Sequence, residues 1–277
     1  MYLSGLKNNG TNPFRAGSER RGMHDEFDLS GRVAVVTGGS RGIGRAIAEG
    51  LAGAGASVVP ASRTAEDVET VAETIRDAGG EARAATVDVT DEDSVGALFE
   101  EAVDAFGGVD VVVNNAGVNP DPALGSPERV DLDDGFDFTV DVNLRGAFAC
   151  AQASAKHLAD GGGSLINVAS VGGLVGLPRQ HPYVASKHGL VGLTKSMALD
   201  WAPEIRVNAI APGYVATDLI EEAMENEDIR QSLLDRTPLE RFAEPEEIAG
   251  PAVFLASDAA SYVTGSVLSV DGGWTSR

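Results

Sequence analysis

The chain has 277 residues, of which 43% are hydrophobic and 23% are charged. This balance suits one large α/β domain with an ample core. The net charge of −21 argues against binding to nucleic acids or to anionic membranes. An acidic, lysine-poor composition resembles that of proteins from salt-loving organisms, in which ions screen the repulsion between acidic groups; an ordinary acidic protein is the alternative. The lysines are Lys7, Lys156, Lys187 and Lys195.

The single cysteine, Cys150, excludes a disulfide within the chain and fits a reducing compartment. Its neighbours are apolar, which favours a small buried residue over a nucleophile. The histidines show no metal-ligand grouping, so no metal is predicted. No apolar run is long enough to span a membrane. We therefore expect a cytoplasmic protein.

The N-terminal residues 1–27 lack the apolar core of a signal peptide. We predict that they form a disordered extension, in which Met23 is an alternative start. No internal repeat and no linker divides the remaining residues. Residues 28–277 are therefore expected to form one domain.

The first strand–turn–helix unit contains a glycine-rich turn. The valine-rich run at 32–37 predicts a buried strand, and residues 45–52 have helical spacing. Thr37-Gly-Gly-Ser-Arg-Gly-Ile-Gly44 between them would place backbone N–H groups and a helix N-terminus around an anion. The glycine spacing differs from GxGxxG, and a glycine-rich surface loop is the alternative. We predict that the turn binds a dinucleotide through Gly38, Ser40, Arg41, Gly42, Ile43 and Gly44.

The end of the next strand bears on the choice of cofactor. In dinucleotide-binding folds an acid at this strand end binds the adenosine ribose 2′-OH. Here the strand ends in Ala61, Ser62 and Arg63, with no acid before Glu66. Arg63 and Arg41 suit a 2′-phosphate instead. NADP(H) is therefore favoured, and NAD(H) is the alternative.

The remaining elements predict a doubly wound Rossmann-like α/β fold, with a parallel seven-stranded sheet and helices on both faces. An acidic helical segment at 218–236 lies in a lid-like region at about 214–240. Ligands of such sheets bind beyond the strand C-termini, where Asp88, Asn114 and Gly117 fall. The further strands are expected at 82–89, 109–113, 164–169, 206–211 and 266–270, and the helices at 65–78, 91–106, 132–159, 183–201 and 245–256.

Tyr183 and Lys187 are four residues apart and share one helical face. A phenol has a pKa near 10, so a neighbouring ammonium would bring it closer to neutrality. The pair is thus a candidate general acid/base. A half-buried tyrosine beside a solvated lysine is the structural alternative.

Taken together, these motifs resemble the short-chain dehydrogenase/reductases over residues 29–274. The motifs are Thr37-Gly-x-x-x-Gly-x-Gly44, Asp88-Val89, Asn114-Asn-Ala-Gly117, Asn143, Ser170, Tyr183-x-x-x-Lys187 and Pro212-Gly213 with Thr217. The resemblance implies an NAD(P)-dependent oxidoreductase that interconverts a secondary alcohol and a ketone. A catalytically idle nucleotide-binding regulatory protein on the same fold is the alternative of another class.

The resemblance also implies residue roles. Tyr183 would exchange the proton of the reacting hydroxyl, and Lys187 would lower its pKa and bind the nicotinamide ribose. Ser170 would hold the substrate oxygen, and Asn143 would anchor a water that links Lys187 to solvent. Further cofactor contacts would come from Asp88, Val89, Asn115, Ala116, Gly117, Pro212, Gly213, Val215 and Thr217.

The substrate and the assembly are read from the same resemblance. Residues 207–218, 236–247 and 270–275 are similar to gluconate 5-dehydrogenases and related sugar-acid or polyol dehydrogenases. The same segments are also similar to 3-oxoacyl-carrier-protein reductases and glucose 1-dehydrogenases. Oxidoreduction of a sugar acid, sugar or polyol is ranked first, and reduction of a 3-oxoacyl thioester second. Family members imply a homotetramer, or a homodimer, although the small residues at 147–155 also suit burial within one subunit.

Overall fold

The computed structural model describes residues 23–159, 161–220 and 224–276. The disorder predicted for residues 1–22 lies outside the described residues. Met23–Phe27, which we had placed in the same extension, form a short 3-10 helix, η2. The ring of Phe27 lies 6.4 Å from that of Phe254, so this contact joins residue 27 to the body of the protein.

A parallel sheet in the order β3-β2-β1-β5-β6-β7-β8 forms the centre of the fold. The predicted third strand is split into β3 and β4, which both pair with β2. The predicted parallel Rossmann-like sheet is confirmed, with this one strand interrupted. The strands are β1 (Val33–Thr37), β2 (Ser57–Ser62), β3 (Glu81–Ala82), β4 (Ala85–Thr86), β5 (Val111–Asn114), β6 (Gly163–Val168), β7 (Ile205–Pro212) and β8 (Val267–Val270).

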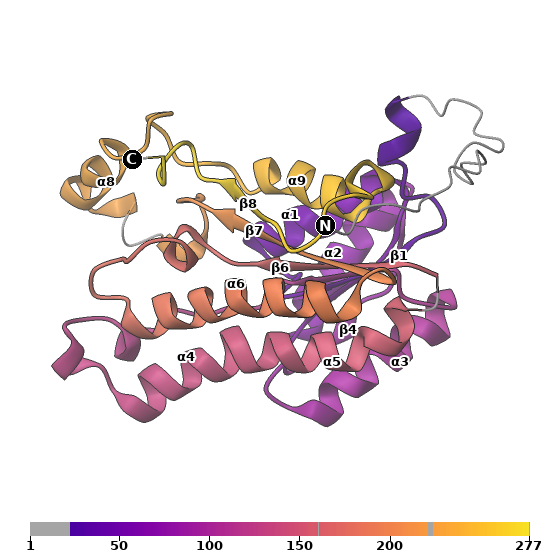
Figure 1. Cartoon of the computed structure of the whole chain (residues 1–277), viewed down its shortest axis with the longest axis horizontal. Coiled ribbons are helices and arrows are strands. Elements are labelled where there is room, and N and C mark those ends of the chain that lie inside the picture. Colours follow the sequence, from indigo (N-terminus) through magenta and orange to yellow (C-terminus); the bar gives the residue numbers. More distant parts are fainter. Residues whose placement is uncertain (1–22, 160, 221–223, 277) are drawn as a thin grey trace, which may run out of the picture.

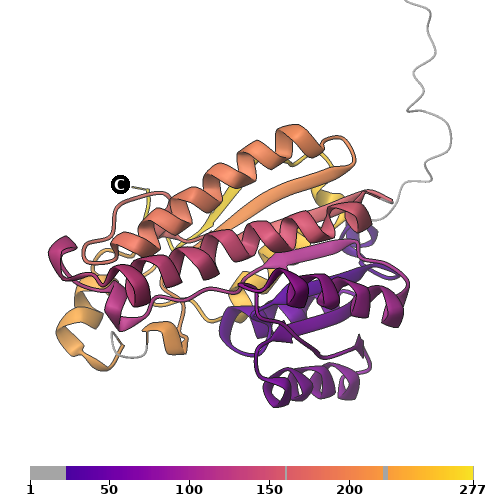
Figure 2. The ribbon, with the colours of Figure 1, turned by 90° about the horizontal axis from the view of Figure 1, so that it is seen from below.

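Helices cover both faces of the sheet (Figure 1). One face carries α1 (Gly42–Gly53), α2 (Ala65–Asp77) and α9 (Glu246–Ala256), whose apolar side chains pack with β1 and β5. The other carries α3 (Glu92–Phe106), α5 (Ala147–Leu158) and α6 (His181–Trp201). Figure 2 shows α5 and α6 running side by side along this second face.

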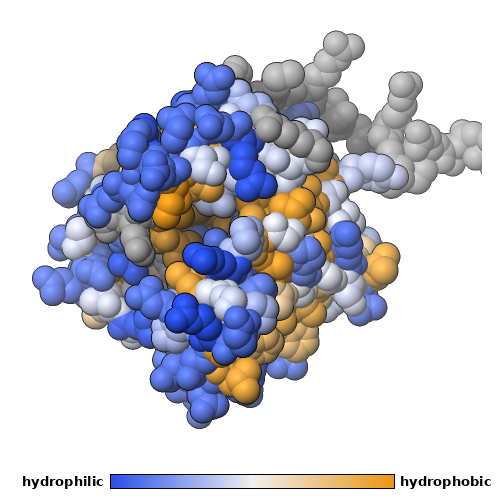
Figure 3. All heavy atoms as spheres, turned by 90° about the vertical axis from the view of Figure 1, so that its left-hand side faces the viewer, coloured by the Kyte–Doolittle hydropathy of each residue, from blue (hydrophilic) through white to orange (hydrophobic). Residues whose placement is uncertain are grey.

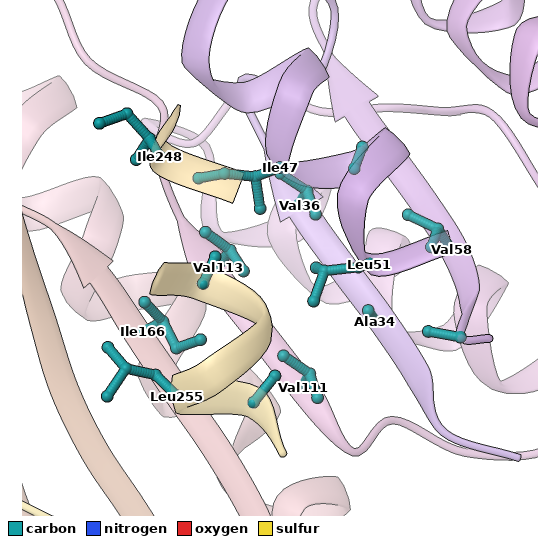
Figure 4. Packing of buried hydrophobic residues seen from close by; sticks show 14 of the residues in the cluster. Ala34, Val36, Ile47, Leu51, Val58, Val111, Val113, Ile166, Ile248 and Leu255 are labelled. Carbon is teal, nitrogen blue, oxygen red and sulfur yellow. The ribbon is translucent and has the colours of Figure 1, made fainter. Parts of the chain in front are cut away.

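The core of the first face shows why these segments fold as they do. β1 and β5 are runs of valine whose residues are all buried, as expected for strands covered on both sides. Ile47 and Leu51 of α1 belong to the same buried cluster over these strands as Ile248 and Leu255 of α9 (Figure 4). On the second face Cys150 is fully buried, and burial raises the pKa of its thiol to about 12. The predicted burial of this cysteine is confirmed.

The long helical region expected at 132–159 contains two π-helical stretches. It runs through η5 (Leu132–Asp137), α4 (Phe138–Val140), η6 (Asp141–Gly146) and then α5. Such wide turns often occur at functional sites. Asn143 lies inside η6 and is 1% exposed.

The acidic segment after β7 is helical where the structure describes it. It contains η8 (Asp218–Ile220) and α8 (Glu227–Leu234), and residues 221–223 lie outside the described part. Across the described ranges, no helix has both the length and the apolar character needed to cross a membrane. The same ranges contain no group of three or more His, Cys, Asp or Glu residues that could hold a metal ion.

Gly50 allows close packing between α1 and α9, which leads to a first prediction. A Cβ at Gly50 would lie 2.7 Å from the Cβ of Ala249, whereas a Cβ at Gly53 would meet nothing within 4 Å. Both replacements by alanine gain about 1 kcal/mol of helix propensity, but only Gly50→Ala overpacks the interface, at a cost of about 1–3 kcal/mol. In urea unfolding, Gly50→Ala should therefore be less stable than Gly53→Ala by that amount. Equal stabilities would contradict this packing.

Candidate active site

The carboxyl ends of the strands gather the predicted site residues at one end of the molecule. Gly38 follows β1, Asn115 follows β5, Ser170 follows β6 and Gly213 follows β7. Figure 3 looks onto this end and shows a hollow bordered by both apolar and polar residues. A doubly wound sheet binds its ligands at this edge.

Tyr183 and Lys187 lie together on the first turns of α6. The Lys187 residue is 4% exposed, and its Nζ lies 5.6 Å from the centroid of the Tyr183 ring. It donates a 2.8 Å hydrogen bond from Nζ to the carbonyl of Val168, the last residue of β6. This bond fixes the helix against the strand end that leads into Ser170.

The pKa of Tyr183 differs from the sequence-based expectation. Burial raises the pKa of this phenol, and a hydrogen bond with the Ser170 side chain partly opposes that rise. Burial also lowers the pKa of Lys187 to about 8. In the free protein, desolvation therefore shifts the pKa of Tyr183 away from neutrality, and the expected lowering by Lys187 is not seen.

Ser170 is 7% exposed and stands directly beside the phenol. Its Oγ accepts a 3.0 Å hydrogen bond from the Gly172 backbone N–H, at the start of the 3-10 helix η7 (Val171–Gly173). A Cβ at Gly172 would lie 3.3 Å from Cε1 of Tyr183 and 3.5 Å from Oγ of Ser170. The absent side chain thus leaves room for the two hydroxyls to approach each other.

Asn143 uses its amide to hold the chain that follows β5. Its Oδ1 accepts a 2.7 Å hydrogen bond from Val118 N, and its Nδ2 donates to Val118 O at 2.9 Å and to Ser186 Oγ at 3.2 Å. A Cβ at Gly117 would lie 3.4 Å from Asn143 Oδ1 and 3.5 Å from Lys187 Nζ. Asn143 and Lys187 therefore flank the same glycine.

The glycine-rich turn is built to receive an anionic group. Gly38 and Gly42 have φ values of +64° and +51°, which favour glycine. Gly44 packs against Gly38 O and the Asn115 side chain, where a Cβ would not fit. No side chain caps the N-terminus of α1, and no acid lies in its first turn. Its first N–H groups are thus left for a phosphate, so these residues fit a dinucleotide.

A cavity of about 510 Å³ extends from this turn along the sheet edge. Gly44, Pro212, Gly213, Tyr183 and Lys187 are not among its lining residues. Val215 is also absent from the lining, because its side chain is 3% exposed within the first core. The predicted residues that do line the cavity are Gly38, Ser40, Arg41, Gly42, Ile43, Ser62, Arg63, Asp88, Val89, Asn115, Ala116, Gly117 and Thr217.

Two acids that the sequence reasoning missed also line this cavity. Asp218 pairs with Arg41 across it, with 3.0 Å between Oδ2 and Nη1. Asp67 lies in the first turn of α2, directly after the strand end that carries Ser62 and Arg63. Asp88 is held by hydrogen bonds from Thr90 that lower its pKa, and Arg63 lowers that pKa further. The other lining residues are Thr64, Val87, Thr90, Val118, Phe138, Val142 and Leu219.

Comparisons with known proteins agree with this fold. A family model described as enoyl-(acyl carrier protein) reductase matches residues 38–275. The chain belongs to the short-chain dehydrogenase/reductase family, and it is an NAD(P)-dependent oxidoreductase of secondary alcohols.

Several individual proteins resemble the chain over most of their length. It is 42% identical to 2-dehydro-3-deoxy-D-gluconate 5-dehydrogenase of Escherichia coli, covering 91% of this chain and 98% of that protein. It is 40% identical to a 3-oxoacyl-[acyl-carrier-protein] reductase of Aquifex aeolicus, covering 90% and 99%. Among solved structures, a gluconate 5-dehydrogenase from Burkholderia cenocepacia in complex with NADP and tartrate matches with a TM-score of 0.87 and 39% identity, covering 92% and 99%.

The buried Lys187 predicts a pH-dependent stability. Its pKa is about 8 in the folded protein, against 10.5 for an exposed lysine. Between these values the unfolded chain binds more protons than the folded chain, so the free energy of unfolding rises with pH. Lys187→Met should remove this rise, and the variant's stability relative to the wild type should be greatest below about pH 8.

Urea unfolding between about pH 7 and pH 10 measures this trend. Lys195→Met is the matched control, because Lys195 is exposed on the same helix. The control should follow the pH dependence of the wild type. Parallel curves for Lys187→Met and the wild type would show that the Lys187 ammonium is not desolvated.

Proposed function

We propose that Tyr183, Ser170, Lys187 and Asn143 carry the reaction, and that its substrate is a sugar acid, a sugar or a polyol. The observation that carries this proposal is the Tyr183 phenol beside the Ser170 hydroxyl, with the buried Lys187 ammonium one turn further along α6. These groups can hold one oxygen atom and move its proton.

In the oxidation direction, the Ser170 hydroxyl binds the substrate oxygen and the Tyr183 phenolate accepts its proton as the C=O bond forms. In reduction, the Tyr183 phenol returns the proton to that oxygen. When bound, a nicotinamide would supply or accept the hydride. Lys187 stabilises the phenolate and binds the nicotinamide ribose. Asn143 fixes the backbone at Val118 and anchors a water that exchanges protons with solvent.

We also propose a preference for NADP(H) over NAD(H). The cavity wall at the end of β2 consists of Ser62 and Arg63, and the guanidinium of Arg63 suits a phosphate. The Burkholderia cenocepacia relative is a complex with NADP. The Asp67 carboxylate on the same wall repels a phosphate. The proposed preference therefore requires the attraction of Arg63 for the phosphate to exceed this repulsion.

This preference predicts the effect of Arg63→Ala. A charged hydrogen bond contributes about 1.5–3 kcal/mol, so the KM for NADPH should rise roughly ten- to hundredfold, while the KM for NADH stays roughly constant. Steady-state kinetics with both cofactors measures the difference. Arg76→Ala, which removes an exposed arginine paired with Glu69 on α2, should change neither value. A similar rise in the KM for NADH in Arg63→Ala would contradict the assignment of Arg63.

The second candidate substrate is a 3-oxoacyl thioester, which the name of the Aquifex aeolicus relative favours. Two of the named relatives are instead dehydrogenases of gluconate or of a gluconate derivative, and on this ground we rank the sugar acid first. Turnover of a substrate from either class would exclude the alternative that the protein is a catalytically idle nucleotide-binding regulator. Nucleotide binding without turnover of any substrate from the two classes would support that alternative.

The lid-like segment at about 214–240 is part of the same proposal. Its closure would exclude water from the hydride transfer.

We propose a cytoplasmic homotetramer, adapted to salt, that assembles through the helices holding Asn143 and Tyr183 and through β8. Phe148 on α5 is 44% exposed and available for such contacts, whereas Cys150 is buried within the subunit. Light scattering at high and low salt tests the assembly.

Tyr183→Phe tests the catalytic assignment. The change removes the proton donor and leaves the ring, so kcat should fall roughly 10²–10⁴-fold while the Kd for the dinucleotide is retained. Turnover and fluorescence titration of NADPH measure the two quantities. Tyr262→Phe is the control, since Tyr262 is fully exposed elsewhere on the surface. Full activity in Tyr183→Phe would refute the proposed acid/base.

A further inference from the structure

The catalytic edge of the sheet continues from Ser170 towards β8. Strands β6, β7 and β8 are parallel neighbours. Ser170 follows β6, Tyr214 follows β7, and Trp274 follows β8. Since neighbouring strands lie about 4.8 Å apart, the ends of β6 and β8 are separated by roughly 10 Å. The side chains after these strands thus form a row beside the catalytic tyrosine.

Two aromatic rings make up the far part of this row. The rings of Tyr214 and Trp274 meet edge to face, with centroids 4.8 Å apart and an interplanar angle of 65°. Trp274 is 7% exposed. Gly273, with φ of +88°, lets Pro238 approach, because a Cβ there would lie 2.8 Å from Pro238 Cγ. Leu239 N donates to Gly272 O at 3.1 Å. The segment around residue 238 is therefore fixed against Trp274.

Arg236 extends from this segment over the indole. Its Cζ lies 4.7 Å from the centroid of the Trp274 ring, while its side chain remains exposed. A guanidinium above an aromatic face keeps its in-plane N–H donors free for a planar, bidentate acceptor. The contact orients Arg236 without using those donors.

Arg236 differs from eight of the thirteen arginines in the described part of the chain in having no acidic partner. Within the described part of the chain, no carboxylate pairs with it. The arginines that do pair with acids are Arg32, Arg41, Arg45, Arg76, Arg83, Arg145, Arg230 and Arg241. In a chain with a net charge of −21, an unpaired cation at the catalytic edge is a local site for an anion.

Tyr214 links this arginine to the catalytic centre. Burial raises the pKa of the Tyr214 phenol, Arg236 lowers it, and Tyr183 raises it. Tyr214 therefore lies within electrostatic reach of both side chains. The order of the strand ends independently places Tyr214 between Ser170 and the Trp274 ring that carries Arg236.

We propose that Arg236, held on the face of Trp274, binds the carboxylate of a substrate whose reacting carbon lies at Tyr183. The inference rests on the proposed function and narrows its substrate class to acids with the carboxylate several carbons from the reacting carbon. In 5-keto-D-gluconate, for example, the carboxylate is C1 and the reacting ketone carbon is C5. A 2-keto acid, whose carbonyl adjoins its carboxylate, does not span the row from Ser170 to Trp274.

The test compares two ketones that differ in one group. L-sorbose has a CH₂OH group where 5-keto-D-gluconate has its carboxylate. With NADPH, Arg236→Gln should raise the KM for 5-keto-D-gluconate roughly ten- to hundredfold, with kcat nearly unchanged, and leave the KM for L-sorbose unaltered. Arg236→Lys keeps the charge but not the planar donors. Its KM for 5-keto-D-gluconate should therefore lie between those of Arg236→Gln and the wild type.

Arg83→Gln is the matched control, because it removes the same charge far from this row, where the exposed Arg83 pairs with Glu101. It should leave both KM values unchanged. Equal effects of Arg236→Gln on the two ketones, or no effect on either, would overturn the carboxylate site while leaving the proposed reaction intact.

Calorimetry separates this inference from the proposed function. D-gluconate and NADPH are both reduced, so their complex with the full-length protein cannot react and reports binding alone. If the wild type reduces neither ketone, the proposed substrate class fails, and the carboxylate site is judged by this titration. Weaker binding to Arg236→Gln than to the wild type supports the site. Equal affinities, or no binding by the wild type, overturn it.

Discussion

The hydrogen bond from the buried Lys187 ammonium to Val168 O is the contact on which the site depends. An ammonium removed from water is costly unless its donors are satisfied. The carbonyl that satisfies one of them belongs to the last residue of β6, two residues before Ser170. The bond thus ties α6, which carries Tyr183, to the strand that carries Ser170. The relative position of the two hydroxyls follows from it.

Backbone groups held by polar side chains complete the same edge. Asn115 Nδ2 donates to Thr37 O and Gly38 O at 3.1 and 3.0 Å and so fixes the glycine-rich turn to the end of β5. Asn143 does the same for Val118 from the opposite side. These bonds satisfy partly buried backbone groups at and just beyond the strand ends. They also fix the cavity walls before any ligand enters, which reduces the ordering required on binding.

The sequence predicted those parts of the fold that depend on local pattern. Valine runs such as Val33–Val36 identify strands buried on both faces, and the order of strands and helices determines a parallel, doubly wound sheet. Position along the strands also located Ser170 and Gly117 at the binding edge, because strand ends meet there. The π-helical turn at Asn143 was not predicted, because it depends on the tertiary contact with Val118.

Other features depend on long-range contacts and burial that no pattern encodes. The Arg41–Asp218 pair joins residues 177 positions apart, and Arg236 reaches Trp274 only because the turn at Gly272 and Gly273 brings the segment after α8 against β8. The spacing of Tyr183 and Lys187 indicated their proximity correctly. It gave the wrong direction for the pKa of Tyr183 in the free protein, because burial raises that pKa by more than the hydrogen bond with the Ser170 side chain lowers it.

The pH dependence of kcat/KM for ketone reduction by NADPH tests the central claim most directly, because this quantity reports the ionisations of the free enzyme. If the desolvated Lys187 ammonium is required at the catalytic centre, kcat/KM should be constant at lower pH and should fall above about pH 8, the pKa to which burial lowers Lys187. A profile that stays level through pH 8 and falls only near pH 10, the ordinary pKa of a phenol or an exposed lysine, would contradict the account.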